Sequence, residues 1–523
     1  PLDTAQTAWK GRLYFLYSSP RRRECRPQAC KREQQQGKQR VPDAVSTPLA
    51  MRGPHRRILV QRRRALHTRP MRLVIVVVLL LLASLRPLQA ATPCVPVEVE
   101  APLRLPRPSA KTTTPGCVDY RRVPRSAGGE RARILVLGDP QVKSMVDVDY
   151  FRRDIIDLLR EAGPFQLGVV LGDLVDDVPA LWPEVQAATA SLDMPWLFAP
   201  GNHDVDPHAT SDADALKGFV HAFGADTRAR QAALFNLVAL DNVISTPGVR
   251  PAYTGGFRED QFAFLERWLP TLERSRLLVL AMHIPLFEEP GRDTFRDGDR
   301  ERLFALLRPF PHVLLLSAHT HTQRHVFHDA ASGWHGGRPL HEFNVGAACG
   351  AFWSGASDAA GIPDATMADG TPNGHALLTV RRGGDYALAW FNARDPHNAA
   401  IGLHAPKVLR RGAYPAWGVY ANVYMGMDDS RVEYRIDGGA WRPMRKVLQP
   451  DPRLMAENRR DDEATALRGY DRSPEAEPSP HLWRGALPTD LAAGEHMVEV
   501  RAFDRWQGEQ RASTTYRLDD ATP

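Results

Sequence analysis

The chain has 523 residues, of which 43% are hydrophobic and 24% charged, and its formal net charge is +6 with a pI near 9.1. Residues 1–70 hold 17 Lys and Arg against 4 Asp and Glu, so they contribute +13 and residues 71–523 sum to −7. The basic pI therefore belongs to the first segment, and the acidic remainder gives no electrostatic reason to expect a nucleic-acid partner.

The N-terminal segments, residues 1–91, resemble sequence that is removed from a protein rather than sequence that folds. Residues 1–70 are rich in Arg, Gln and Pro without periodicity, which predicts a basic disordered segment that is not part of the mature protein. Residues 71–91 predict a signal peptide, with a basic start, an apolar run over 73–85 and small residues after it. That run is shorter than the ~20 residues of a membrane span, so no stable span is expected; a buried core helix is the alternative. We expect a periplasmic or secreted protein translated from Met71, or from Met51.

Residues 92–130 contain many Pro, Lys and Arg and predict an extended N-terminal arm. Cys94 and Cys117 flank its Pro-rich stretch. In an oxidising compartment they could form a disulfide, the alternative being two free thiols. Cys349 is expected to be a small buried side chain rather than a nucleophile.

Residues 131–395 predict an α/β domain, because apolar strands alternate with segments of helical spacing. The expected strands are 134–137, 168–171, 196–199, 235–240, 277–282 and 313–317. The expected helices are 149–162 and 259–274. This alternation indicates a sheet with both faces covered.

Residues 405–520 predict a small all-β, immunoglobulin-like sandwich. Strands are expected at 419–424, 432–436, 497–502 and 514–518, with a hairpin turn at Asp437-Gly438-Gly439. A polar insert over 451–480 interrupts this pattern of strands, and an insert of that length is expected to be a mobile or functional loop.

Five short polar blocks each follow a predicted strand of the α/β domain. They are Asp139-Pro140-Gln141, Gly172-Asp173-Leu174-Val175-Asp176, Gly201-Asn202-His203-Asp204, His283 and His319-Thr320-His321. Carboxylate, amide and imidazole groups bind hard and borderline divalent cations. Functional groups of α/β sheets collect at the carboxyl ends of strands, so the five blocks are predicted to converge on one site.

The order and strand context of these blocks resemble the calcineurin-like metallophosphoesterase superfamily over residues 131–385. Segments 344–355 and 364–374, together with the C-terminal sandwich, are similar to the secreted bacterial branch that has its own C-terminal domain. The resemblance implies an αββα core and two divalent metal ions. It implies that Asp139, Gln141, Asp173 and His321 hold the first metal, and that Asp173, Asn202, His283 and His319 hold the second.

The resemblance also implies roles for residues that do not bind metal. His203 would contact the phosphate or protonate the leaving group, and Asp176 would orient its imidazole, with Asp204 as the rival orienter. The alternative for His203 is a residue at a helix start with no proton role.

Two positions depart from the family pattern. Gln141 stands where histidine is usual, and its neutral oxygen is harder than imidazole, which favours manganese, iron or magnesium over zinc. Ala318 replaces a usual glycine, which is a mild change. Two carboxylates offset only half the charge of two divalent cations, so the centre favours an anionic phosphate ester.

The expected function is hydrolysis of phosphate mono- or diesters by a metal-activated hydroxide in an exported enzyme. The substrate would be a small phosphate ester or a phosphorylated macromolecule. The alternative is a non-catalytic periplasmic protein that binds a glycan or cell-wall component through its C-terminal domain and has a structural metal site. The glycine-rich run 346–355, with Phe352 and Trp353, is a candidate substrate-facing wall, or else a packed loop.

Overall fold

The computed structural model describes residues 97–99, 130–288, 295–394, 396, 398–414 and 417–521, all within one compact unit, Gln89–Pro523. The expected basic segment, the signal peptide and the Cys94–Cys117 disulfide lie outside these residues, as does most of the expected arm. Within the arm, β1 (Val97–Val99) pairs in parallel with β5 (Arg228–Gln231). None of the helices in the described ranges is both long enough and apolar enough to cross a bilayer.

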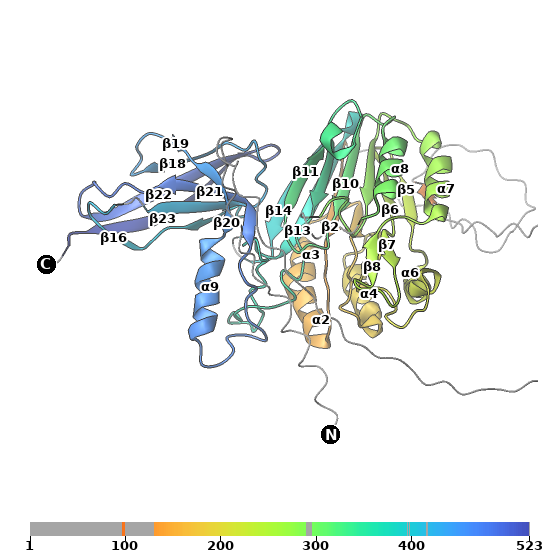
Figure 1. Cartoon of the computed structure of the whole chain (residues 1–523), viewed down its shortest axis with the longest axis horizontal. Coiled ribbons are helices and arrows are strands. Elements are labelled where there is room, and N and C mark those ends of the chain that lie inside the picture. Colours follow the sequence, from red (N-terminus) through yellow and green to blue (C-terminus); the bar gives the residue numbers. More distant parts are fainter. Residues whose placement is uncertain are drawn as a thin grey trace, which may run out of the picture. The chain divides into compact units, whose positions relative to one another are not determined.

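Two sheets form the centre of the α/β domain (Figure 1). The seven-stranded sheet has the order β1-β5-β6-β9-β10-β12-β11, and the five-stranded sheet has the order β14-β13-β2-β3-β4. The first contains β6 (Phe235–Ala239), β9 (Leu277–Ala281), β10 (Val313–Ser317), β11 (Arg324–His328) and β12 (Leu340–Asn344). The second contains β2 (Arg131–Leu137), β3 (Leu167–Val170), β4 (Trp196–Phe198), β13 (Gly374–Arg381) and β14 (Tyr386–Asn392). A separate hairpin joins β7 (Val243–Ser245) to β8 (Tyr253–Gly255).

Each sheet has a parallel centre. Strands β6, β9, β10 and β12 run parallel in the larger sheet, and β2, β3 and β4 run parallel in the smaller one. Of these strands, β9 and β10 are nearly continuous apolar runs, because both of their faces are buried. The carboxyl ends of the parallel strands in a sheet lie along one edge.

Alternation along β9 shows how the layers stack. Leu277 and Val279 belong to the core shared with the five-stranded sheet, whereas Leu278 and Leu280 belong to the core that contains α7 (Glu259–Trp268) and α8 (Asp297–Leu307). Figure 1 shows α7 and α8 beside β5, β6 and β10. The helices that pack with the five-stranded sheet are α2 (Met145–Phe151), α3 (Asp157–Ala162), α4 (Trp182–Ala190) and α6 (Lys217–Phe223). The expected α/β sandwich core is confirmed.

The remaining helical segments are short. They are α5 (Asp212–Ala215), the π-helical turn Arg152–Ile156 and the 3₁₀ turns Pro179–Leu181, Leu269–Thr271, Ala330–Ser332 and Arg382–Gly384. The helix expected over 149–162 begins earlier, at Met145, because the Ser144 hydroxyl accepts a hydrogen bond from the backbone N–H of Asp147 and caps the first turn.

Two further sheets make up the C-terminal domain, and their inner faces enclose a third hydrophobic core. One sheet consists of β15 (Ile401–His404), β17 (Gly418–Val423), β21 (Pro478–Ala486) and β20 (Arg445–Pro450). The other consists of β16 (Val408–Arg410), β23 (Gly508–Asp519), β22 (Gly494–Asp504), β18 (Val432–Ile436) and β19 (Arg442–Pro443). The expected β-rich C-terminal domain is confirmed.

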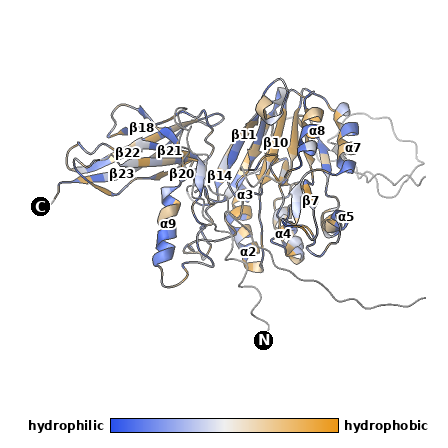
Figure 2. Cartoon of the chain, in the orientation of Figure 1, coloured by the Kyte–Doolittle hydropathy of each residue, from blue (hydrophilic) through white to orange (hydrophobic). Residues whose placement is uncertain are grey.

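The prediction of a loop over 451–480 is wrong for the first half of that segment, which forms α9 (Pro452–Glu463). Asp451 caps this helix by accepting from the backbone N–H of Arg453, and Pro452 occupies its first turn. Of its residues only Leu454 is buried, and Figure 2 shows α9 as largely hydrophilic. The helix therefore lacks the apolar stripe by which a sequence pattern reveals a helix.

Candidate metal centre

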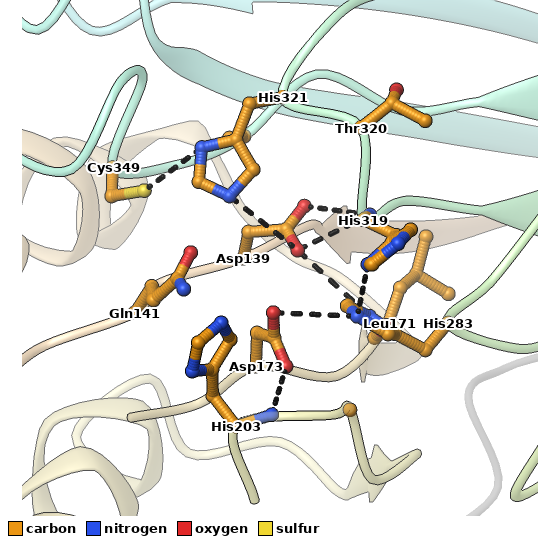
Figure 3. Close-up of polar contacts among 12 residues, drawn as sticks. Asp139, Gln141, Leu171, Asp173, His203, His283, His319, Thr320, His321 and Cys349 are labelled. Atoms are coloured by element: carbon orange, nitrogen blue, oxygen red, sulfur yellow. Dashed lines mark hydrogen bonds and ion pairs between the residues drawn. The ribbon is translucent and has the colours of Figure 1, made fainter. Parts of the chain in front are cut away.

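The five polar blocks lie at the carboxyl ends of parallel strands from both sheets. The first three blocks follow β2, β3 and β4 of the five-stranded sheet, and the last two follow β9 and β10 of the seven-stranded sheet. Figure 3 shows at least one side chain from each block pointing toward a common centre, namely those of Asp139, Asp173, His203, His283, His319 and His321. The structure therefore brings together the residues that were predicted from separate parts of the sequence.

The backbone at this site is strained. Five of the seven predicted ligands have positive φ, a conformation that costs a non-glycine residue about 1–3 kcal/mol. They are Asp139 (41°), Gln141 (39°), Asp173 (48°), His319 (72°) and His321 (48°). Backbone bonds hold these loops, as in the 2.8 Å bond from the N–H of Gln141 to the carbonyl of Asp173. Strain gathered at ligand positions is typical of a functional site.

Two glycines allow the ligand loops to approach each other. A Cβ atom on Gly201 would lie 2.2 Å from both the backbone nitrogen and Oδ1 of Asp173. A Cβ atom on Gly172, whose φ is +99°, would lie 2.6 Å from Nδ1 of His283. Both positions therefore require glycine for the ligands to converge.

Two of the three predicted histidine ligands are oriented by backbone carbonyls. Nδ1 of His283 lies 2.9 Å from the carbonyl oxygen of Leu171, and Nδ1 of His321 lies 2.7 Å from that of Gly350. A carbonyl only accepts, so Nδ1 carries the proton in each ring. The Nε2 atom of each ring then faces the centre, as in histidines that bind metals.

His319 is oriented by a residue that the sequence did not indicate. Its Nε2 lies 3.4 Å from Oε1 of Glu288, and its Nδ1 lies 3.1 Å from Nε2 of His283. If both histidines hold their protons on the outward nitrogens, two lone pairs face each other. A cation between them would remove that repulsion. Ligand atoms of Asp173, His283 and His319 all lie within 4.8 Å of one another.

Gln141 has a buried amide oxygen with no hydrogen-bond partner among the described residues. Its Nε2 donates to Oδ1 of Asp176 at 3.4 Å, which leaves Oε1 free. An unpartnered buried oxygen costs free energy unless something binds it. Metal coordination would satisfy this oxygen, so Gln141 fits the role of a ligand.

The two predicted carboxylate ligands are buried and affect each other. Burial and the charge of Asp173 raise the pKa of Asp139 to about 8. Burial also raises the pKa of Asp173, but the charges of His283 and His203 outweigh it and hold that pKa below its usual range. Asp173 is central, because its Oδ2 lies 3.3 Å from Nε2 of His283 and its Oδ1 accepts from the backbone N–H of His203 at 2.8 Å. Buried carboxylates of this kind fit a site for divalent cations.

Asn202, the remaining predicted ligand, lies on the same side as His283. Its Oδ1 is 3.0 Å from Nε2 of His283. Carboxylate, amide and imidazole atoms thus meet in the combination that was expected, and the donor set fits two divalent ions. The division of ligands between the two ions stays a prediction.

His203 lies at the edge of the centre between two carboxylates. Its Nδ1 is 3.0 Å from Oδ1 of Asp177 and 3.4 Å from Oδ1 of Asp176. Burial lowers its pKa, but the negative charges of Asp173, Asp177 and Asp176 outweigh burial and raise the pKa to about 10. Asp176 is therefore near His203 as expected, but Asp177 is closer and was missed. Its only sequence signal is its place directly after the Gly-Asp block.

Asp204, the rival orienter, has another role. Its carboxylate accepts from the backbone N–H groups of Leu174 and Gly201 and from Nε1 of Trp182, at 2.9–3.2 Å. These bonds join the loop after β3 to the loop after β4. The contacts of Asp204 therefore give no support to the interpretation that it orients His203.

The glycine-rich run divides into one exposed and one buried aromatic residue. Phe352 is 46% exposed, and its ring stacks on that of His321 with centroids 4.6 Å apart. Trp353 is 1% exposed and donates from Nε1 to the carbonyl of Pro140 at 2.9 Å. Phe352 therefore borders the site, whereas Trp353 packs beneath the first ligand loop.

Cys349 is free and buried, as expected. Its Sγ lies 3.8 Å from Nδ1 of His321. Burial raises the pKa of the thiol well above its usual value, so it stays protonated and is a poor nucleophile.

Comparison with known families agrees with the geometry of the site. Residues 132–323 match the model of the calcineurin-like phosphoesterases, and residues 342–509 match the model of the C terminal of calcineurin-like phosphoesterase. The chain is therefore a calcineurin-like metallophosphoesterase that carries the C-terminal domain found in that family. No curated protein matches the chain.

Solved structures that resemble part of the chain are distant in sequence. A dimetal phosphatase from Danio rerio is 14% identical over 49% of this chain and 98% of its own, with a TM-score of 0.33. A purple acid phosphatase from yellow lupin (Lupinus luteus) seeds is 15% identical over 51% of this chain and 52% of its own, with a TM-score of 0.34. GAP50, described as the anchor in the inner membrane complex of Plasmodium, is 13% identical over 51% of this chain and 86% of its own, with a TM-score of 0.32.

Proposed function

We propose that this protein is an exported, metal-dependent phosphoesterase that hydrolyses phosphate mono- or diesters. The observation that carries the proposal is the convergence of ring nitrogens of His283, His319 and His321 on buried carboxylates and on the amide oxygen of Gln141, which has no partner among the described residues. Such a cluster favours cations, and bound cations favour an anionic ester.

Each of two divalent ions would have four protein ligands, with Asp173 shared. The proposed sets are Asp139, Gln141, Asp173 and His321 for one ion, and Asp173, Asn202, His283 and His319 for the other. When bound, the pair would neutralise charge on the phosphoryl oxygens and lower the pKa of a water molecule. The oxygen of Gln141 favours manganese, iron or magnesium over zinc at the first position.

His203 would act on the leaving group. Its Nδ1 faces the carboxylates of Asp177 and Asp176, so its Nε2–H is the proton available to the leaving oxygen. The charge of Asp173 contributes to its raised pKa, and a cation bound at Asp173 would cancel that contribution. The pKa of His203 would then move toward the range that suits a general acid.

Export would follow from the signal peptide proposed at residues 71–91, which would place the enzyme in the periplasm or outside the cell. Sequencing the N-terminus of the exported protein tests this. A mature N-terminus upstream of residue 71 would contradict it.

The enzymatic proposal is tested with the full chain loaded with manganese. We expect turnover of p-nitrophenyl phosphate or bis(p-nitrophenyl) phosphate, and we expect Asp173→Ala and Asn202→Ala each to lower kcat/KM by about 100-fold or more. Both variants should also bind less metal in elemental analysis. Asp428→Ala is a matched control, because this aspartate is fully exposed in the C-terminal domain. Absence of turnover by the metal-loaded protein, or full activity of Asp173→Ala, would refute the proposal.

A further inference from the structure

Three side chains from separate segments are connected, directly or through one another, to Gln141 and His321. Lys143 follows Gln141 by two residues, Phe352 comes from the glycine-rich run, and Tyr470 comes from the C-terminal domain. Phe352 is 46% exposed and Tyr470 is 62% exposed. We call these three residues the aromatic rim.

Phe352 is held beside a predicted ligand. Its ring stacks on the imidazole of His321 at an angle of 27°, and its φ is +58°. The next residue, Trp353, is fixed by its bond to the carbonyl of Pro140. A strained backbone anchored in this way presents the Phe352 ring at the border of the site rather than burying it.

Lys143 connects the first ligand loop to Tyr470. Its Nζ lies 5.2 Å from the centre of the Tyr470 ring. No carboxylate of the described residues forms an ion pair with Lys143, so its charge is available to a ligand. The charge of Lys143 also acts on Asp176, which accepts a hydrogen bond from Gln141. Burial raises the pKa of Asp176, and the positive charges of His203 and Lys143 oppose that rise.

The loop that carries Tyr470 is fixed against the segment that follows Phe352. The backbone N–H of Gly355 donates to the carbonyl of Asp471 at 3.2 Å, and that of Ser357 donates to the carbonyl of Arg468 at 3.1 Å. A Cβ atom on Gly469 would lie 2.0 Å from the carbonyl oxygen of Gly355, so the two segments are in close contact.

Helix α9 fixes the other side of this loop. The guanidinium of Arg468 bonds both Glu457 and Asp461 of α9, each at 3.0 Å. The polar segment that interrupts the C-terminal domain thus places an exposed tyrosine beside Lys143, two residues after Gln141.

We propose that the aromatic rim is the leaving-group subsite of the enzyme and that it selects phosphate esters whose leaving group is a planar aromatic ring. The inference rests on the proposed function. Two exposed rings offer faces on which a planar group can stack, and the ammonium of Lys143, which has no ion pair among the described residues, attracts the phosphate. An alkyl leaving group of the same size gains less from the same surfaces.

Phenyl phosphate and cyclohexyl phosphate test the proposal, since their leaving groups have similar size and differ in planarity. For each variant, the ratio of kcat/KM for the two esters is divided by the ratio for the unaltered protein, which cancels their intrinsic reactivities. We expect Tyr470→Ala and Phe352→Ala each to lower this ratio by about 2- to 10-fold. Lys143→Met should lower kcat/KM for both esters, because its charge serves the phosphate.

Two controls separate stacking from general damage. Tyr470→Phe keeps the ring and is expected to keep the ratio. Tyr414→Ala removes a tyrosine that is 93% exposed in the loop before β17 of the same domain, and is expected to leave the ratio unchanged. Unchanged ratios in Tyr470→Ala and Phe352→Ala, with normal turnover by the unaltered protein, would overturn the subsite alone. No turnover of any ester by the metal-loaded protein would overturn the proposed function and the subsite with it.

Discussion

Gln141 shows most directly how a single side chain can indicate a ligand. Its Nε2 has a partner in Asp176, while its buried Oε1 has none among the described residues. The neighbouring histidines behave in the same way, with one nitrogen bound to an acceptor and the other facing inward. The centre is thus defined by side-chain atoms that face inward while the opposite end of each side chain is held by a hydrogen bond.

The first prediction concerns metal choice. Gln141→His replaces a hard oxygen by a borderline nitrogen, so the variant loaded from equal manganese and zinc should bind a larger share of zinc than the unaltered protein. Elemental analysis after gel filtration measures that share. Gln186→Ala, which alters a glutamine on α4 that bonds only the carbonyl of Ala222, serves as the control. Equal zinc shares in Gln141→His and in the unaltered protein would contradict the role of Gln141.

The second prediction concerns the orientation of His203. Asp177 is closer to Nδ1 than Asp176, at 3.0 against 3.4 Å, so Asp177→Asn should lower kcat more than Asp176→Asn. If His203 protonates the leaving group, the loss should be about 10- to 100-fold for an alkyl ester and smaller for p-nitrophenyl phosphate, whose leaving group needs no proton. Equal losses for both esters would mean that His203 has no proton role.

The seven predicted ligands could be found from the sequence because each is a metal-binding residue type placed directly after an apolar strand. Asp177 and Glu288 were missed because they act through a neighbouring histidine and follow no strand end. The contacts of such residues depend on how loops fold over the site, and residue spacing does not encode that.

At the level of elements, the loops after β3 and β4 depend on one another. Asp204 bonds both loops, and Gly201 has no room for a side chain against Asp173. The position of Asp173 is therefore set by the neighbouring strand as well as by its own. This explains how parallel strands deliver ligands to a common point.

The third prediction tests that packing. Gly201→Ala places a methyl group against the backbone of Asp173, and should lower both metal content and stability, the latter by about 1–3 kcal/mol. Gly298→Ala is the matched control, because that glycine lies in α8 and a Cβ atom there would have no other atom within 4 Å, so the change should stabilise by about 0.5–1 kcal/mol. Bound metal and thermal unfolding measure the two effects. A Gly201→Ala variant with full metal content would contradict the close packing of the loops.

The strands were easier to predict than the helices. β9 and β10 are buried on both faces, so their sequences are unbroken apolar runs. α9 was missed because it lies on the surface and buries only Leu454. The Ser144 cap moved the start of α2 four residues earlier than the apolar spacing suggested, because a cap acts through one polar side chain.

At the level of the whole molecule, a buried polar contact joins the phosphoesterase core to the C-terminal domain. Asp369 of the core accepts from the backbone N–H of Gln323 at 2.8 Å and lies 3.2 Å from Nε2 of His481 on β21. Gln323 follows the predicted ligand His321 by two residues, so the C-terminal domain supports a loop of the candidate centre.

The fourth prediction concerns this contact and its pH dependence. Burial alone would raise the pKa of Asp369, but the hydrogen bond from His481 and those from Gln323 and Thr371 outweigh it and hold the pKa below its usual value. A carboxyl with a lowered pKa in the folded state stabilises above its unfolded pKa, near 3.9, and this stability is lost as the pH falls through the folded value.

Asp369→Asn should therefore destabilise the protein by about 1–3 kcal/mol at pH 7, because it removes a charged acceptor from several buried hydrogen bonds. The difference in Tm between the variant and the unaltered protein should shrink as the pH falls below 4. Asp385→Asn, at an exposed position in the same domain, should show no such trend. A Tm difference that is constant from pH 7 to pH 3 would contradict the account.

The predicted metal ligands come from both sheets, so bound metal ions would affect the stability of the folded chain. Ions held by both sets would tie the two layers together much as a disulfide ties two strands, but reversibly. By mass action, each tenfold rise in free metal above the dissociation constant would add about 1.4 kcal/mol per site to the free energy of unfolding. The supply of trace metal in the surroundings would then govern the lifetime of the folded chain as well as its rate of turnover, which unfolding experiments at buffered metal concentrations can measure.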